Sequence, residues 1–186
     1  DVLRQNESTK TAKTNEKFAT EFDFKNLQAS LGTNKVLLEF AKFDGRFAAF
    51  AVSDKKIIFI KDLAIETEIV EILESLHFQF GALRYGAKIR GKYADELKKR
   101  ADFYLGKLYE KLLAPLENFI ENKDLIIVPA DSLHYVPFQA LKTGEKYLIE
   151  TRLINYAPSA NVWSLLQKKP RRNMQSALLI GFADER

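Results

Sequence analysis

The sequence predicts an α/β fold, in which an antiparallel β-meander and helices lead into the first strands of a mostly parallel, incomplete sheet. Three apolar, β-prone runs come first, separated by short turn signals. Two long segments with helical periodicity follow, and the later apolar runs are short, continuous and separated by helix signals. Continuous apolar strands of this kind are typical of a sheet covered on both faces. The chain has 186 residues, 46% of them hydrophobic, which suffices for one domain with a substantial core.

The chain begins with a polar stretch. Residues 1–22 are rich in Lys, Thr, Asn and Glu and contain few apolar anchors. This composition predicts a linker, or the end of an upstream region of a longer protein. The folded part is therefore expected over residues 23–186. At its start, Asp23 is placed to cap a short helix that carries Leu27 and Leu31, and Gly32 to end it.

Turn residues define the meander. Asp44-Gly45 separates the first two apolar runs, and this dipeptide is a strong hairpin signal because Gly tolerates a positive φ. Ser53-Asp54 separates the second run from the third. The segment after the third run predicts a helix, because five apolar residues recur on one helical face: Ile65, Ile69, Ile72, Leu73 and Leu76.

A second long helix is predicted over residues 93–121, where leucines keep helical spacing. Pro115 lies inside this pattern and is expected to kink the helix or start a new turn. The apolar run of residues 124–130 then predicts a strand, and residues 146–158 predict one or two more. Ser159 can cap a further helix by accepting a backbone N–H hydrogen bond. A last apolar strand is expected over Ala177–Gly181, where a βα alternation is still under way.

Composition excludes several classes of function. No apolar run approaches the roughly 20 residues that span a bilayer, and no secretory signal stands at the N-terminus. The absence of Cys excludes disulfides, thiolate metal sites and a cysteine nucleophile within these residues. We therefore expect a cytoplasmic protein without a membrane partner. The net charge of +4 permits an acidic partner but does not require one.

Three catalytic residue types, Asp131, Ser132 and His134, lie within four positions of one another. In known triads the nucleophile, the base and the orienting acid come from separate segments and converge in space. Asp-Ser is also ordinary turn chemistry, since both short side chains bond local backbone groups. We therefore predict a turn here, with His134 packing or hydrogen-bonding beside it. Pro137 then fits the first position of a helical turn that points Phe138 and Leu141 inward.

Neither metal-ligand spacing nor a phosphate-binding loop is recognisable. His77, the other histidine, has no partner at ligand spacing, and Gly86 and Gly91 do not follow a strand. Basic charge gathers with two tyrosines in residues 84–100 and again in residues 168–172, which keeps nucleic-acid binding open as the weakest of three functional hypotheses. Glu110, Glu117 and Glu121 are read as solvent-facing. We assign no catalytic, cofactor-binding or metal-binding residue within this chain, and no cofactor.

The second half of the chain resembles the CHAT domain family, whose caspase-like domains are often found after tetratricopeptide repeats. The resemblance lies in the succession "DLIIVPADSLHYVPFQAL", "KYLIETRLINYAPSANVWSLL" and "SALLIGF". Upstream, "NLQASLGTNKVLLEFAKFDGRFAAFAV" and "LYEKLLAPLENFI" look like the family's N-terminal portion, so that the resemblance runs from about Leu27 to Gly181. The marks of the motif are Leu133, His134, Pro137, Phe138, Ala140 and Leu141, then Tyr156, Pro158 and Ser159.

The resemblance implies a caspase-like sheet and cysteine peptidase chemistry, with a nucleophilic Cys assisted by a His that usually precedes Gly. Both residues are expected downstream of Arg186, and His134 does not occupy the position of that catalytic His. The leading hypothesis is thus the N-terminal, non-catalytic part of a bacterial CHAT-type cysteine endopeptidase. Its expected partners are the C-terminal half of the domain, upstream repeats and a protein substrate. The alternative is a CHAT-like protein-interaction scaffold without peptidase activity.

Overall fold

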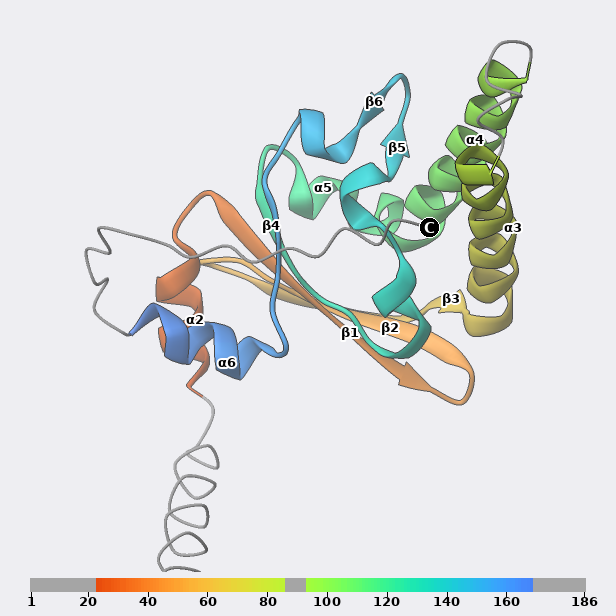
Figure 1. The fold of residues 1–186 in the computed structure, drawn as a ribbon. Helices are drawn as coiled ribbons and strands as arrows, with labels where there is room; N and C mark the ends of the chain where they lie inside the picture. The colour runs from red at the N-terminus through yellow and green to blue at the C-terminus, as the bar shows by residue number, and fades with distance from the viewer. Residues whose placement is uncertain (1–22, 86–92, 169–186) are drawn as a thin grey trace, which may run out of the picture.

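A computed structural model describes residues 23–85 and 93–168. The described strands form a five-stranded mixed sheet in the order β3-β2-β1-β4-β7 and a separate two-stranded hairpin of β5 and β6 (Figure 1). The α/β fold class predicted from the sequence is confirmed. The α-helices are α2 (Phe24–Leu31), α3 (Glu66–Tyr85), α4 (Ala94–Leu112), α5 (Glu117–Ile120) and α6 (Ala160–Gln167). The strands are β1 (Lys35–Phe43), β2 (Arg46–Val52), β3 (Ile57–Ile65), β4 (Asp124–Val128), β5 (Lys142–Thr143), β6 (Lys146–Tyr147) and β7 (Ile154–Tyr156).

The predicted meander is present as β1, β2 and β3. Asp44 and Gly45 form the first turn with φ values of 49° and 71°, the pair of positive values that a tight hairpin requires. Antiparallel pairing runs from Leu37 opposite Val52 to Phe43 opposite Arg46. Strand β3 pairs with β2 on the other side and is therefore an edge of the sheet.

The sheet becomes parallel at β4. This strand pairs with β1 on one side, from Lys35 opposite Asp124, and with β7 on the other side. Strand β4 is buried from Leu125 to Val128, which explains its continuous apolar sequence. The meander and the later strands thus share one sheet.

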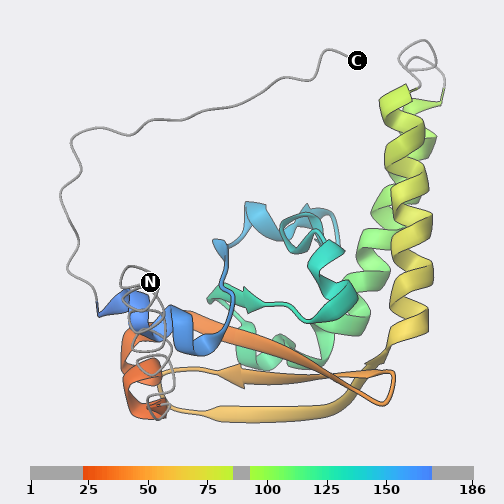
Figure 2. The same ribbon diagram turned by 60° about the horizontal axis from the view of Figure 1, so that its bottom comes forward.

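Helices cover the two faces of the sheet. On one face, α3 and α4 form an antiparallel helical hairpin that stands beside the sheet (Figure 2). Their apolar stripes join the large core, which includes Ile69, Leu76, Leu105 and Leu112. On the other face, α2 and α6 lie together and form a smaller core with β1 and β4. Asp23 caps α2 through Asn26 N–H, and Ser159 caps α6 through Val162 N–H at 3.1 Å, as predicted.

Several boundaries differ from the expectation. Ile65 is the last residue of β3, so α3 begins directly at Glu66. Helix α4 ends at Leu112, and a 3-10 turn, η1 (Ala114–Leu116), holds Pro115 at its start before α5 begins. The predicted single helix is therefore broken, because proline lacks the N–H that would continue the ladder. Residues 1–22, the predicted strand Ala177–Gly181 and most of the basic segment 168–172 lie outside the described residues. Across the parts that the structure describes, no helix has the length and apolarity needed to cross a bilayer.

Candidate functional site

The segment between β4 and β5 carries the family motif, and 3-10 turns shape it. Strand β4 ends at Val128, and Asp131 then takes a positive φ of 50° to begin η2 (Asp131–Tyr135). Asp tolerates this left-handed conformation better than most residues do. A second turn, η3 (Phe138–Ala140), follows, with Pro137 at its N-cap rather than at its first helical position. The predicted turn at Asp131-Ser132 is confirmed, but the expected hydrogen bond of the Ser132 side chain to local backbone is absent among the described residues.

A cation from β1 holds the start of η2. Lys42 forms an ion pair with the carboxylate of Asp131 and a second one with Glu66 at 2.8 Å. The hydrogen bond from Lys42 lowers the pKa of Asp131, and the hydrogen bonds to Asp131 and Glu66 raise the pKa of Lys42. Asp131 is thus hydrogen-bonded to a lysine of β1, and this contact joins the turn to the meander.

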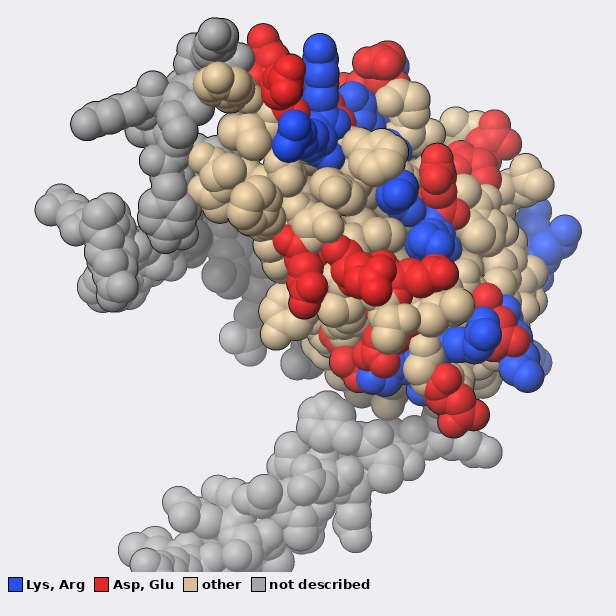
Figure 3. Space-filling model, turned by 90° about the vertical axis from the view of Figure 1, so that its right-hand side faces the viewer, with Lys and Arg blue, Asp and Glu red and all other residues tan. Residues whose placement is uncertain are grey.

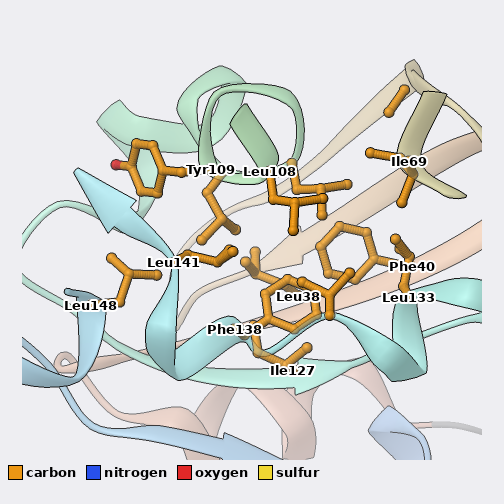
Figure 4. Close-up of a cluster of buried hydrophobic side chains, with 14 of the residues drawn as sticks. Leu38, Phe40, Ile69, Leu108, Tyr109, Ile127, Leu133, Phe138, Leu141 and Leu148 are labelled. Carbon is orange, nitrogen blue, oxygen red and sulfur yellow. The ribbon is translucent and has the colours of Figure 1, made fainter. Parts of the chain in front are cut away.

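Phe138 is the anchor of the motif. Its side chain is fully buried, and its ring centroid lies 5.6 Å from that of Phe40 and 6.3 Å from that of Tyr156 (Figure 4). The Tyr156 hydroxyl donates a 2.9 Å hydrogen bond to Gln139 Oε1. Leu141 is also buried, so the predicted inward pair of Phe138 and Leu141 is confirmed. These contacts give the aromatic residues of the motif a packing role.

The side chains of Ser132 and His134 lie in different environments. The Ser132 hydroxyl oxygen is buried and makes no hydrogen bond to any described residue. His134 is exposed on η2, so of the two expected alternatives, packing or hydrogen-bonding beside the turn, the packing is wrong. The 3-10 backbone explains this, since residues two apart project in different directions. A serine nucleophile needs a hydrogen-bonded base, and the described part of the chain provides none at Ser132.

Ser132 and His77 both line a pocket of about 330 Å³, a relationship that the sequence did not reveal. Helix α3 supplies one wall of the pocket and η2 supplies the other. No sequence signal could have paired these segments, because their contact depends on how the helical hairpin packs against η2. The lining residues are Val70, Leu73, Glu74, His77, Ser132 and Tyr135.

A charged cluster fastens the β5–β6 hairpin to α4. Asp102 accepts hydrogen bonds from Lys98 Nζ at 2.8 Å, Lys142 Nζ at 2.9 Å and the Tyr147 hydroxyl at 2.7 Å. Burial alone would raise the pKa of Asp102, but these three donors lower it to about 2. Asp102 also lines a groove of about 520 Å³ between α4 and the hairpin. The two lysines compensate the negative charge of Asp102 within the cluster, so the cluster has the structural role of joining the hairpin to α4.

A third hollow, of about 330 Å³, lies on the opposite face of the sheet near α2 and α6. Its lining is largely apolar and includes Phe50 and Ile57, with Glu39 as the single acid. Burial raises the pKa of Glu39, while a hydrogen bond from the backbone N–H of Ala160 lowers it in part.

The remaining candidate residues do not gather into a chemical site. Glu117 accepts a hydrogen bond from the Tyr109 hydroxyl, and Glu110 and Glu121 are exposed. Within residues 23–85 and 93–168, no group of three His, Asp or Glu residues could hold a metal ion. On the face shown in Figure 3, acidic and basic side chains are interspersed among the described residues. This distribution gives no continuous basic stripe there for a nucleic-acid backbone.

A protein-family model matches the part of the chain that contains this motif. Residues 103–186 match the model of the CHAT domain, a range that begins within α4 and contains β4, η2, η3 and α6. The resemblance over residues 27–102 lies outside the matched range and stays a prediction. No curated protein matches the chain. Residues 103–186 of this chain are therefore similar to the CHAT domain family.

Proposed function

We propose that this chain is the N-terminal, non-catalytic part of a CHAT-type cysteine endopeptidase that acts on protein substrates. The observation that carries the proposal is the CHAT match over residues 103–186, which suggests a caspase-like family. In such a domain the chemistry requires a Cys nucleophile and a His that assists proton transfer. This chain contains no Cys, so the nucleophile would come from residues outside it.

The contacts of the motif support a scaffolding role within the domain. Asp131 is held by Lys42, and Phe138 is enclosed between β1 and β7. Strand β4 is paired on both sides, so it is a fixed interior strand. Rigid strands of this kind position catalytic loops that lie elsewhere in a domain.

The second hypothesis is a CHAT-like interaction scaffold without peptidase activity. The parent sequence discriminates between the two, because only a peptidase needs a His-Gly motif and a later Cys. The discriminating experiment measures hydrolysis of an unfolded protein substrate by the full-length parent, with and without iodoacetamide. Hydrolysis that iodoacetamide abolishes supports the peptidase. A parent that is folded and inert on every substrate under all activating conditions overturns it.

Two controls make this experiment specific. Residues 1–186 alone are expected to show no hydrolysis and no alkylation by iodoacetamide. The Ser132→Ala variant of the parent is expected to keep its activity, since its hydroxyl has no hydrogen-bonded base among the described residues. If the Ser132→Ala parent folds but loses its activity, Ser132 on η2 takes part in catalysis and the proposed location of the active site is wrong.

A further inference from the structure

On the face of the sheet that carries α2 and α6, an acid stands in an apolar row. Glu39 of β1 lies opposite Phe50 of β2, and Phe50 lies opposite Phe59 of β3. On its other side Glu39 lies beside Val128 of β4. Residues paired in this way project from the same face of a sheet. Glu39 therefore has an apolar neighbour on each side.

Part of this row lines the hollow of about 330 Å³ beside α2 and α6. Phe50 is 39% exposed and Ile57 is 44% exposed, so the apolar wall of the hollow is open to solvent. Phe59, whose ring centroid lies 4.5 Å from that of Phe50, extends the exposed apolar surface outside the hollow. Glu39 is the one charged side chain among the described residues of the lining. The hollow thus combines an apolar wall with a single negative charge.

The structure around Glu39 does not require its charge. The carboxylate accepts a hydrogen bond from the backbone N–H of Ala160, the first residue of α6, and no described cation offsets the charge. A neutral amide oxygen could accept the same hydrogen bond, and Ser159 already caps this helix. Because burial raises the pKa of Glu39, ionising the side chain within the hollow costs stability. Residues that reduce stability in this way are typical of functional sites.

We propose that the hollow binds a lysine or arginine side chain presented by a peptide segment of a partner protein. The apolar wall suits the alkyl stem of such a side chain, and the cationic head would pair with the Glu39 carboxylate. Phe50, which lines the hollow, adds a cation–π contact. The volume of about 330 Å³ lies at the lower end of the range of ligand sites, roughly 300–1,000 Å³, and suits one side chain rather than a large cofactor.

The apolar surface outside the hollow favours a peptide over a small amine. Phe59 is 49% exposed and does not line the hollow, so a ligand that fills only the hollow leaves this ring in water. Apolar residues on either side of the basic residue in a peptide would cover it. The proposal concerns binding alone, and it applies to a peptidase and to an interaction scaffold alike.

Peptides that differ in one side chain provide the test. Four peptides with the same flanking leucines carry lysine, norleucine, arginine or citrulline at the centre, so that each basic side chain has a neutral counterpart of similar shape. Titration of residues 1–186 with each peptide, followed through backbone amide chemical shifts in NMR, measures both the affinity and the location of binding. We expect each basic peptide to bind at least about ten-fold more tightly than its neutral counterpart. The shift changes should centre on Phe50 and Ile57.

Variants of the chain separate the charge from the fold. Glu39→Gln keeps an acceptor for the Ala160 N–H and should weaken binding of both basic peptides at least about ten-fold, while its thermal melt at pH 7 shows no loss of stability. Phe50→Leu keeps an apolar wall without a ring and should weaken binding about two- to five-fold. Glu71→Gln removes an exposed acid of α3, on the other face of the sheet, and should leave binding unchanged.

The proposal is overturned if none of the four peptides binds, if basic and neutral peptides bind equally, or if folded Glu39→Gln chains bind as the wild type does. Two further results would assign the hollow to a different occupant and overturn the choice of a peptide. One is binding of n-butylammonium as tight as that of the lysine peptide, which would indicate a small amine. The other is self-association of residues 1–186 that Glu39→Gln abolishes in sedimentation equilibrium, which would indicate a second copy of the chain.

Discussion

Phe40 and Phe138 lie in contact in the core, with ring centroids 5.6 Å apart and ring planes inclined by 32°. Phe40 belongs to β1 of the meander, and Phe138 belongs to the turn that carries the CHAT motif. The contact therefore joins the part of the chain outside the family match to the part inside it. The two parts share one hydrophobic core, and a change at this contact should affect both.

Replacing Phe138 by Ala tests this shared core. The substitution removes a fully buried ring and leaves a cavity beside Phe40, so we expect the free energy of unfolding to fall by about 3–5 kcal/mol. Urea denaturation followed by circular dichroism measures the change. Phe78→Ala is the matched control, because Phe78 is 72% exposed on α3 and should cost far less. Equal effects of the two substitutions would contradict the enclosure of Phe138.

Two glycines should respond oppositely to the same substitution. Gly45→Ala places a Cβ at a φ of 71° in the β1–β2 turn, and we expect a loss of about 1 kcal/mol. Gly81→Ala lies inside α3, where an added Cβ meets no atom within 4 Å, and we expect a gain of about 0.5–1 kcal/mol. Thermal melts of both variants measure the two signs. A stabilised Gly45→Ala variant would show that the hairpin turn is wrong.

The ionisation of Asp102 should make the free energy of unfolding depend on pH in the acidic range. Its folded pKa of about 2 lies below its ordinary value of 3.8, so its stabilising contribution is present above about pH 4 and is lost as the pH falls toward 2. Asp102→Asn should cost about 1–3 kcal/mol at pH 7, and this difference should shrink as the pH falls from 4 to 2. Unfolding midpoints measured across that range provide the test. Glu110→Gln, exposed on the same helix, should leave the wild-type pH profile unchanged.

Glu39 should act with the opposite sign. Burial raises its folded pKa above the ordinary value of 4.5, so stability is greatest below that value and falls as the pH rises through the folded pKa. In Glu39→Gln the amide oxygen can still accept the hydrogen bond from Ala160, and no charge forms. We expect the variant to be more stable than the wild type at pH 7 and equal to it at pH 4. If chemical denaturation finds the same stability difference at both pH values, burial of the Glu39 charge is not the cause. Glu71→Gln, which changes an exposed residue of α3, is the control for the effect of removing a surface carboxylate.

Local chemistry made much of the fold predictable. Asp23 and Ser159 could be recognised as helix N-caps in the sequence, because each side chain accepts a hydrogen bond from a backbone N–H only three residues away. Asp44 and Gly45 set the hairpin through their own φ preferences. Pro115 broke the second long helix as one of its two expected outcomes. Each of these features is decided within one turn of chain.

Features that depend on contacts between segments far apart in the chain could not be predicted from the sequence. The parallel pairing of β1 with β4 is fixed by the common sheet and not by either strand alone. The cluster around Asp102 needs α4 and the β5–β6 hairpin to meet, and its lysines look like ordinary surface charges in sequence. The exposure of His134 was missed because the predicted turn did not specify the 3-10 geometry that directs its side chain toward solvent. The shared pocket of His77 and Ser132 has the same kind of origin.

The position of β4 beside β1 also has a consequence for synthesis on the ribosome. The meander is translated first, and α3 and α4 must then be made before β4 exists. At about 5–20 residues per second, the apolar edge of β1 therefore waits several seconds for its neighbour. During that interval the nascent chain presents an unsatisfied strand to other nascent chains and to chaperones. The order of translation makes β1, an interior strand of the finished sheet, an edge strand in the growing one.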